Sequence, residues 1–257
     1  MVSMKRASVL AFTLLLVALG LCGCSDNANH KASGKSGAST TSSRPSQAPK
    51  AAHATVRLVW SHVGKSFGDA QVWYVARVDN RAPTLASVAL NVRALDASRA
   101  IVGSSQVTLP NVPGQSNFDY FGYLGGPPSD TNLTGTPVKI DVSEAHNAFG
   151  QAGAVEMPML RTSEITLALG SEDTNTNAPY SYDLTAKVTN DISREVDGGV
   201  TQQVVLYDSA GHVVGGDTGT SDNAPDSLPT GMSYREQWTG IPALHHAVRA
   251  VYSVWVG

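Results

Sequence analysis

The sequence is poor in cysteine and in charge. Only two cysteines occur in 257 residues, Cys22 and Cys24, and both lie near the N-terminus. Neither a disulfide framework nor a cysteine-based zinc site can therefore form in the rest of the chain. Charged residues make up 15% of the sequence, against about 25% in typical soluble domains. Apolar residues make up 42%, which is enough for one large β domain or two ordinary ones.

The distribution of charge argues against a nucleic-acid partner. Residues 55–257 carry 12 basic and 20 acidic side chains, so their net charge is −8. A protein that binds nucleic acid needs a basic surface to neutralise phosphates, and this region has no basic stripe. We therefore expect no nucleic-acid partner.

Residues 1–23 have the pattern of a bacterial lipoprotein signal peptide. The positive pair Lys5-Arg6 precedes the apolar stretch Ala7–Leu21, which is too short for a stable membrane span. The sequence Leu21-Cys22-Gly23-Cys24 then resembles the lipobox, in which a small residue precedes the lipidated cysteine. Only Cys24 fits, because Gly23 stands before it. The resemblance implies that acyl chains such as palmitate on Cys24 anchor the chain in the cell membrane, facing outside the cytoplasm. An ordinary signal peptide with two incidental cysteines is the alternative.

Residues 24–54 form a tether after the lipidated cysteine. From Ser25 to Ala54 there is no Val, Ile, Leu, Met, Phe, Trp or Tyr. Such a segment cannot bury enough apolar surface to offset the entropy lost on ordering, so we expect a disordered linker. Its r.m.s. span would be about 30 Å. Its four basic residues against one acidic residue allow contact with anionic lipid, although a solvated spacer is the simpler interpretation.

From residue 55 onward the sequence is typical of an all-β protein. Apolar and polar residues alternate with period two, which predicts half-buried strands. The first run places Val56, Leu58 and Trp60 on one face. Similar runs occur at Val72–Val78, Val88–Ala94, Tyr180–Val188 and Val248–Val256.

The two halves of this region contain the same sequence features in the same order. These are a strand ending at Asn, a strand ending in Asp, a Val-Gly pair, and a Leu-Pro turn. In the first half these features are Trp73–Asn80, Leu95-Asp96, Val102-Gly103 and Leu109–Gly114; in the second they are Ser181–Asn190, Tyr207-Asp208, Val214-Gly215 and Leu228–Gly231. The shared order of these features is stronger evidence for an internal repeat than any single match. It predicts two tandem β-sandwich domains, at 55–150 and 151–257.

The second half resembles the FxLYD-type domain of extracytoplasmic bacterial proteins. The resemblance is carried by Val204–Asp208, Gly211 and Val214-Gly215, with Val188–Asn190 before them and Pro229–Gly231 after them. The first half matches more loosely, with Arg99 where the motif has its turn glycine. The family implies an immunoglobulin-like sandwich and a module rather than an activity.

The residues of this motif are suited to structural roles in a strand and the turn that follows it. We expect Leu206 to point into a core and Tyr207 to lie on the opposite face of the strand. Asp208 can accept backbone N–H groups in the following turn, where Gly211 would supply a positive φ.

No catalytic or metal centre emerges from the motifs. Gly64–Gly68 matches GxSxG, but strands are predicted on both sides, which indicates a hairpin rather than a nucleophile elbow. Asp173, Asn175 and Asn177 have the spacing of a calcium loop without its glycine and closing glutamate. His245 and His246 are adjacent and would point to opposite faces of a strand. We therefore expect no catalytic residues, no metal, no cofactor and no enzyme activity.

One segment remains as a candidate partner-binding surface. Tyr120, Phe121 and Tyr123 precede a polar, Gly- and Pro-rich loop, Gly125–Pro137, that has no counterpart of equal length in the second half. The alternative is that the rings fill a core or the gap between the domains. The expected function is that of a non-catalytic, lipid-anchored binding or scaffolding module for an unknown envelope protein or polymer. An envelope-polymer hydrolase and a passive structural spacer are the alternatives.

Overall fold

The structure, a computed structural model, describes residues 54–66, 68–127, 129, 131–145, 156–171, 176 and 178–257. They belong to one compact unit, Pro49–Gly257. The predicted signal peptide, Cys24, the tether up to residue 53 and the predicted domain boundary at residues 150 and 151 lie outside the described residues. Every regular element in the described part is a strand, so the predicted all-β class is confirmed.

The described strands fall into two consecutive sets with the same pairing. The first set comprises β1 (Ala54–Ser66), β2 (Asp69–Asn80), β3 (Ala89–Leu95), β4 (Ile101–Thr108), β5 (Ser116–Leu124) and β6 (Lys139–Glu144). The second comprises β7 (Met159–Leu169), β8 (Tyr180–Thr189), β10 (Val200–Tyr207), β11 (Val213–Thr220), β13 (Ser233–Ala243) and β14 (Arg249–Val256), with the short pair β9 (Val196–Asp197) and β12 (Ser227–Leu228).

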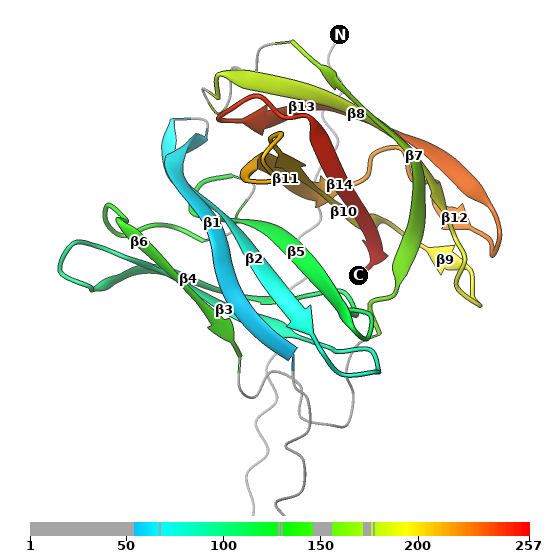
Figure 1. Cartoon of the computed structure of the whole chain (residues 1–257), viewed down its shortest axis with the longest axis horizontal. Coiled ribbons are helices and arrows are strands. Elements are labelled where there is room, and N and C mark those ends of the chain that lie inside the picture. Colours follow the sequence, from blue (N-terminus) through cyan, green and yellow to red (C-terminus); the bar gives the residue numbers. More distant parts are fainter. Residues whose placement is uncertain are drawn as a thin grey trace, which may run out of the picture. The chain divides into compact units, whose positions relative to one another are not determined.

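The long strands of both sets pair in the same order. The first half has two three-stranded sheets, β1-β2-β5 and β4-β3-β6, and in the second half β7-β8-β13 and β11-β10-β14 pair alike within one closed barrel (Figure 1). In the second half both edges are joined, by Gly215 pairing with Ala243 and by Val254 and Trp255 pairing with β7, so its six strands close on themselves. The internal repeat found in the sequence is thus present in the strand order.

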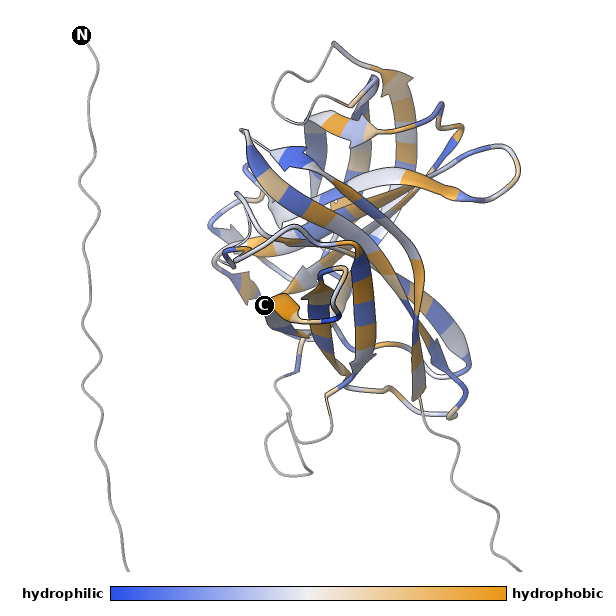
Figure 2. Cartoon of the chain, turned by 90° about the vertical axis from the view of Figure 1, so that its left-hand side faces the viewer, coloured by the Kyte–Doolittle hydropathy of each residue, from blue (hydrophilic) through white to orange (hydrophobic). Residues whose placement is uncertain are grey.

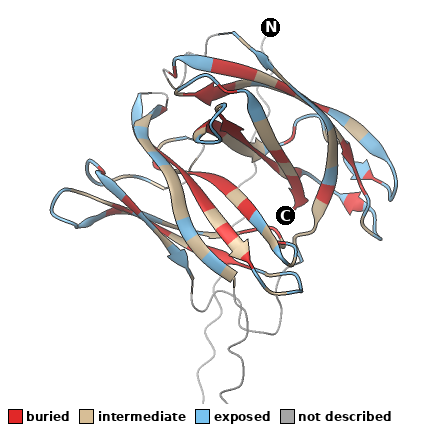
Figure 3. Ribbon diagram, in the orientation of Figure 1, coloured by how far each residue is buried: buried red, intermediate tan, exposed pale blue. Residues whose placement is uncertain are grey.

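The buried apolar residues form three hydrophobic clusters. The first core lies between β1-β2-β5 and β4-β3-β6, and it includes Val72, Tyr74, Leu90, Val92 and Phe118. The second core lies inside the closed sheet of the second half and includes Leu184, Val188, Val204, Leu206 and Ile241. The central cluster joins the two halves and comprises Trp73, Val75, Phe121, Ala178, Val205 and Tyr207. Because β2 contributes to two clusters, six consecutive residues from Gln71 to Ala76 are buried (Figure 3).

Alternation of apolar and polar residues is visible along most strands (Figure 2). One predicted face is wrong, however. Val56 and Leu58 pack against the first core, whereas Trp60 packs against the central cluster. The pairing of β1 with β2 shifts between Leu58 and Trp60, and this bulge adds one residue that moves Trp60 to the other face. Beyond the bulge, β1 pairs with β2 up to Ser66 and Asp69, as a hairpin requires.

The same turn follows β3 and β10. Asp96 accepts the backbone N–H groups of Ser98 and Ala100, and Asp208 accepts those of Ala210 and His212. A hydrogen bond from the Ser98 side chain does most to lower the pKa of Asp96. The backbone N–H of His212 does most to lower the pKa of Asp208.

The third residue after each aspartate has a left-handed backbone. Gly211 has φ +83°, and Arg99 occupies the equivalent place at φ +69°. Glycine adopts this conformation without cost, whereas a residue with a Cβ atom is strained. The repeat therefore uses one backbone shape with two residue types, and the first half bears the strain.

This difference predicts opposite effects of two substitutions. Gly211→Val should lower the free energy of unfolding by about 1–3 kcal/mol, because a β-branched residue disfavours positive φ. A Cβ atom at Gly211 would meet no atom within 4 Å, so a collision would not contribute. Arg99→Gly should raise the free energy of unfolding by about 0.5–1 kcal/mol. Urea unfolding followed by tryptophan fluorescence measures both, and a loss of stability in Arg99→Gly would contradict the argument.

Candidate functional site

The junction between the two halves is formed by the outer faces of β1-β2-β5 and β11-β10-β14. Along β5 the residues alternate: Phe118, Tyr120 and Leu124 belong to the first core, whereas Phe121 and Tyr123 belong to or pack against the central cluster. Asp119 shares the outer face with them by the period of the strand. A single strand thus supplies both the core of its own half and the contact with the other.

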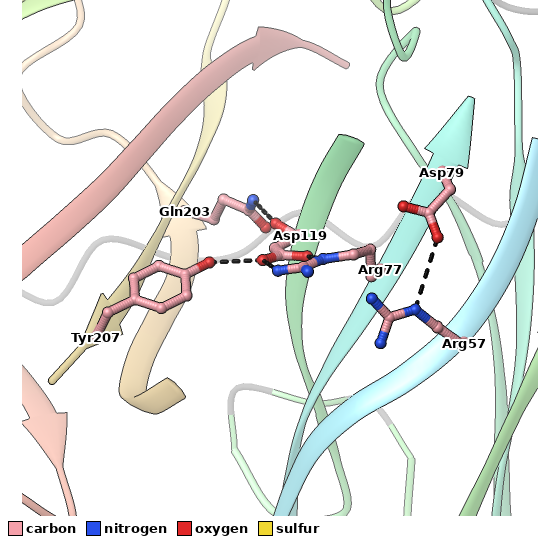
Figure 4. Close-up of polar contacts among 6 residues, drawn as sticks. All are labelled: Arg57, Arg77, Asp79, Asp119, Gln203 and Tyr207. Atoms are coloured by element: carbon pink, nitrogen blue, oxygen red, sulfur yellow. Dashed lines mark hydrogen bonds and ion pairs between the residues drawn. The ribbon is translucent and has the colours of Figure 1, made fainter. Parts of the chain in front are cut away.

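Asp119 connects the two halves through hydrogen bonds (Figure 4). Its carboxylate accepts two bonds from Arg77 of β2, at 2.6 and 2.5 Å, and one from the hydroxyl of Tyr207 of β10, at 2.6 Å. Burial alone would raise the pKa of Asp119, but the hydrogen bonds from Arg77 and Tyr207 outweigh it and hold the pKa below its usual value. Burial and the hydrogen bond to Asp119 raise the pKa of Tyr207. Asp119 is therefore a charged acceptor and Tyr207 a neutral donor at neutral pH.

Gln203 of β10 continues this contact along β5. Its side-chain oxygen accepts the backbone N–H of Phe121 at 3.0 Å, and its side-chain nitrogen donates to the backbone carbonyl of Asp119 at 2.7 Å. These are the bonds that a neighbouring strand would make with the edge of β5. Gln203 has no exposed surface, and it satisfies two backbone groups that burial would otherwise leave without partners.

One further hydrogen bond spans the junction, and a cation–π contact lies beside it. The hydroxyl of Tyr123 on β5 donates to Asp217 of β11 at 2.5 Å. Within the second half, the guanidinium of Arg249 lies 4.0 Å from the centre of the Tyr207 ring, at the distance of a cation–π contact. The position of β11 against β5 is thus set by side chains on both strands.

The structure places the sequence-derived candidates in different environments. Tyr120 is 9% exposed and belongs to the first core, and Phe121 has no exposed surface and lies in the central cluster. Both rings therefore pack inside the protein, as the alternative interpretation expected, and the fully buried Phe121 offers no surface to a partner. Tyr123 is only half-buried. Leu206 lies in the second core and Tyr207 on the opposite face of β10, at the junction.

The loop after β5 is tied to the first half. The carbonyl of Pro127 accepts hydrogen bonds from Ser66, at 2.9 Å, and from the side chain of Gln71, at 2.7 Å. Leu133 packs against the first core, and the backbone N–H of Thr134 donates to the carbonyl of Val102 at 2.7 Å. The described residues of this loop are therefore held in place on the strands beneath them.

A hollow of about 430 Å³ opens where this loop meets three strands. Its volume falls within the roughly 300–1,000 Å³ of small-molecule sites. Ser105 of β4, Tyr120 and Tyr123 of β5, and the end of β11 form its walls. The described lining residues are Ser105, Tyr120, Tyr123, Ser129, Thr131, Thr218, Gly219 and Thr220.

A second hollow of about 340 Å³ lies on the other side of the loop. Ser129 lines both hollows, so they adjoin at this residue. The described lining of the second hollow is Asp69, Ala70, Gly126, Pro127, Ser129, Asn132 and Leu133.

The first hollow is rich in hydroxyl groups and free of charged side chains among its described lining residues. Seven of the eight residues carry a hydroxyl, and the eighth is Gly219. No histidine, cysteine or carboxylate is among them, and no group of three such residues able to hold a metal ion occurs in the described part of the chain. The described walls of the hollow can thus exchange hydrogen bonds with a ligand.

Sequence reasoning missed the residues that join the halves. Arg77, Asp119, Gln203 and Asp217 stand in ordinary strand positions, and their partners are 42 to 94 residues away in the chain. The only local signal is the apolar run Val204–Tyr207, which has no polar residue on its second face. Such a run is typical of a strand buried on both sides.

Comparison with known proteins gives no relative: no family model matches the chain, and no curated protein matches it. Among the described residues, no helix has the length and apolar character to cross a membrane.

The junction predicts a specific loss of stability. Tyr207→Phe should lower the free energy of unfolding by about 1–3 kcal/mol, because it removes a hydrogen bond to a charged acceptor without leaving a large void. Asp79→Asn is the matched control: it removes the Arg57–Asp79 pair, whose atoms are 3.6 Å apart at the surface, and should change stability by at most about 0.5–1 kcal/mol. Equal effects of the two substitutions in urea unfolding would contradict the proposed importance of Asp119.

The same carboxylate predicts a dependence on pH. The pKa of Asp119 is lower in the folded chain than in the unfolded chain, so its ionised form stabilises the fold above the ordinary aspartate pKa of about 4. This contribution is lost as the pH falls through the lowered pKa. Wild type should therefore lose more unfolding free energy between pH 7 and pH 3 than Asp119→Asn does. Identical acid dependence in the two proteins, measured by urea unfolding at both pH values, would show that Asp119 does not contribute in this way.

Proposed function

We propose that this chain is a lipid-anchored extracytoplasmic protein whose two immunoglobulin-like halves form a non-catalytic binding module. The observation that carries the proposal is the hydroxyl-lined hollow at the junction, with walls from both halves and from the loop after β5. A passive spacer has no use for such a site. An envelope-polymer hydrolase would need a general acid or base at the bond it cleaves, and the described lining of the hollow holds neither a carboxylate nor a histidine.

The strand order supports the immunoglobulin-like assignment. The first half places its first, second and fifth strands in one sheet and its fourth, third and sixth in the other, and the second half pairs its long strands in the same order within a closed barrel. Immunoglobulin-like sandwiches place strands A, B and E in one sheet and C and F in the other. The third long strand of the second half is also the one that ends in Leu206-Tyr207-Asp208, the motif on which the resemblance to the FxLYD-type domain rests.

The proposed anchor is the acylated Cys24. Its position after a small residue and an apolar stretch supports this role, and the polar residues that follow would hold the binding module away from the bilayer. The module would then meet an envelope protein or polymer outside the cytoplasm.

Substitution of Cys24 tests the anchor. Cys24→Ala should abolish incorporation of labelled palmitate and release the protein from the membrane fraction, because acyl transfer needs the thiol. Cys22→Ala is the control and should be labelled like wild type. Labelling that persists in Cys24→Ala, or that depends on Cys22, would overturn the assignment.

Retention on envelope material tests the binding function. The full chain, solubilised in detergent, is mixed with envelope fragments whose lipid has been extracted with the same detergent, and the sedimented fraction is measured by immunoblot. Wild type should sediment with the fragments. Thr220→Trp should not, because Thr220 lines the hollow from an exposed position on β11, so the larger ring can fill the hollow without displacing a buried side chain.

Ser104→Trp provides the matched control. Ser104 is exposed on β4, next to the lining residue Ser105 but on the opposite face of the strand. This variant adds the same side chain outside the hollow and should leave retention unchanged. Wild type that fails to sediment, or Thr220→Trp that sediments fully, would reject the hollow as a binding site.

A further inference from the structure

We propose that the hollow between β4, β5 and β11 binds a neutral oligosaccharide. This inference rests on the proposed binding function and names its ligand class. It comes from the chemistry of the walls, their lack of charge, the continuity of the two hollows and the closure of the β5 edge.

The walls match the hydrogen-bonding character of a sugar. A hydroxyl is both a donor and an acceptor, and so is each hydroxyl of a carbohydrate. The hydroxyls of Ser105, Tyr120, Thr131 and Thr220 make no hydrogen bond to another described residue. A ligand dense in hydroxyl groups can therefore bond to several walls of the hollow at once.

Two tyrosines supply the apolar part of the surface. The Tyr123 ring is fixed by its bond to Asp217 and by edge contacts with Trp73 and Phe121, whose ring centres lie 6.4 and 5.2 Å away. Burial raises the pKa of Tyr120 to about 12, so its hydroxyl remains protonated and able to donate at neutral pH. Rigid rings with a polar end suit the C–H faces and hydroxyl edges of sugar rings.

The absence of cationic side chains on the described lining selects against anionic ligands. No lysine or arginine is among the described lining residues of either hollow, so phosphate or carboxylate groups would lose their water without gaining a cation. The carboxylate of Asp217, adjacent to the first hollow, is engaged by Tyr123 and by the backbone N–H of Thr218. Asp69 in the second hollow would repel an acidic polymer further.

The two hollows favour an oligomer over a single sugar. They adjoin at Ser129, and the second adds the side chain of Asn132, which can both donate and accept. A chain of several sugar units could cross the loop at Ser129 and occupy both.

A peptide strand is a poorer fit for this site. Addition of a strand requires a free sheet edge, and β5 is the edge of its sheet. The amide of Gln203, however, already pairs with the backbone of β5 at Asp119 and Phe121. An added strand would have to displace this buried side chain.

Direct titration of the full chain in detergent tests the ligand class. The probes are tetrasaccharides of glucose, mannose, galactose and arabinose, a tetragalacturonate as the acidic sugar, and an extended valine- and threonine-rich heptapeptide. At least one neutral tetrasaccharide should bind, by calorimetry, with a Kd of about 1 mM or tighter. Tetragalacturonate and the heptapeptide should not bind.

Three variants place the ligand in the hollow. Ser105→Ala and Thr220→Val should each weaken binding of the neutral tetrasaccharide roughly tenfold, the scale of one lost hydrogen bond. Thr220→Trp should abolish it, because the ring fills the hollow. Ser104→Ala removes a hydroxyl of the same type outside the hollow and should bind like wild type. Tetrasaccharide binding that is equal in wild type and Thr220→Trp would place the sugar elsewhere and overturn the inference.

The outcomes separate the ligand class from the binding function. If wild type sediments with envelope fragments and Thr220→Trp does not, but no neutral tetrasaccharide binds or competes, then the hollow binds a ligand and the carbohydrate inference is wrong. Binding of the heptapeptide alone would identify a peptide ligand instead. If neither fragments nor tetrasaccharides bind, both proposals fail together.

Discussion

The carboxylate of Asp119 joins the two halves of this protein through a hydrogen bond to a buried charge. It belongs to the edge strand of one sheet, is held by Arg77 of the neighbouring strand, and receives the hydroxyl of Tyr207 from the other half. Since the side chain of Asp119 is 9% exposed, removal of either donor would leave a buried charge only partly compensated. Around it, Trp73, Val75 and Val205 exclude water. The charge of Asp119 and the apolar residues around it hold the two halves together. The outer face of β1-β2-β5 and the outer face of β11-β10-β14 are therefore buried against each other.

Equivalent strands of the two halves have different surroundings. The third long strand of each half is paired in the same way, so Asn91, Arg93 and Leu95 of β3 correspond to Gln203, Val205 and Tyr207 of β10. In β3 these residues lie on an outer face, and Arg93 is exposed. In β10 the same positions face the junction and are buried. Both turns contain the aspartate, whereas the charged, exposed Arg93 of the first half corresponds to the apolar, buried Val205 of the second.

This difference also defines how far the sequence could be interpreted. Period-two alternation located most strands, and the Asn and Asp marks located the repeated turns, because both are local properties of the chain. The continuous apolar run Val204–Tyr207 indicated burial on both faces without identifying what covers the second face. The bulge between Leu58 and Trp60 has no such signal, since a strand tolerates an inserted residue at many positions. The contacts of Asp119 and Gln203 depend on the docking of two sheets, which no local pattern encodes.

The hollow depends on the same docking. Its walls come from β4, β5 and β11, and these strands belong to three different sheets in the two halves. If the halves moved independently, Tyr123 and Thr218 would not hold a constant separation, and a ligand would have to supply the ordering free energy itself. The Asp119 contact, the Gln203 amide and the Tyr123–Asp217 bond order these walls during folding instead. A binding site made of weak, uncharged hydroxyl groups needs such preorganisation more than a charged site does, because each of its hydrogen bonds adds little by itself. The stability of the junction and the affinity of the hollow are therefore two consequences of one arrangement of side chains.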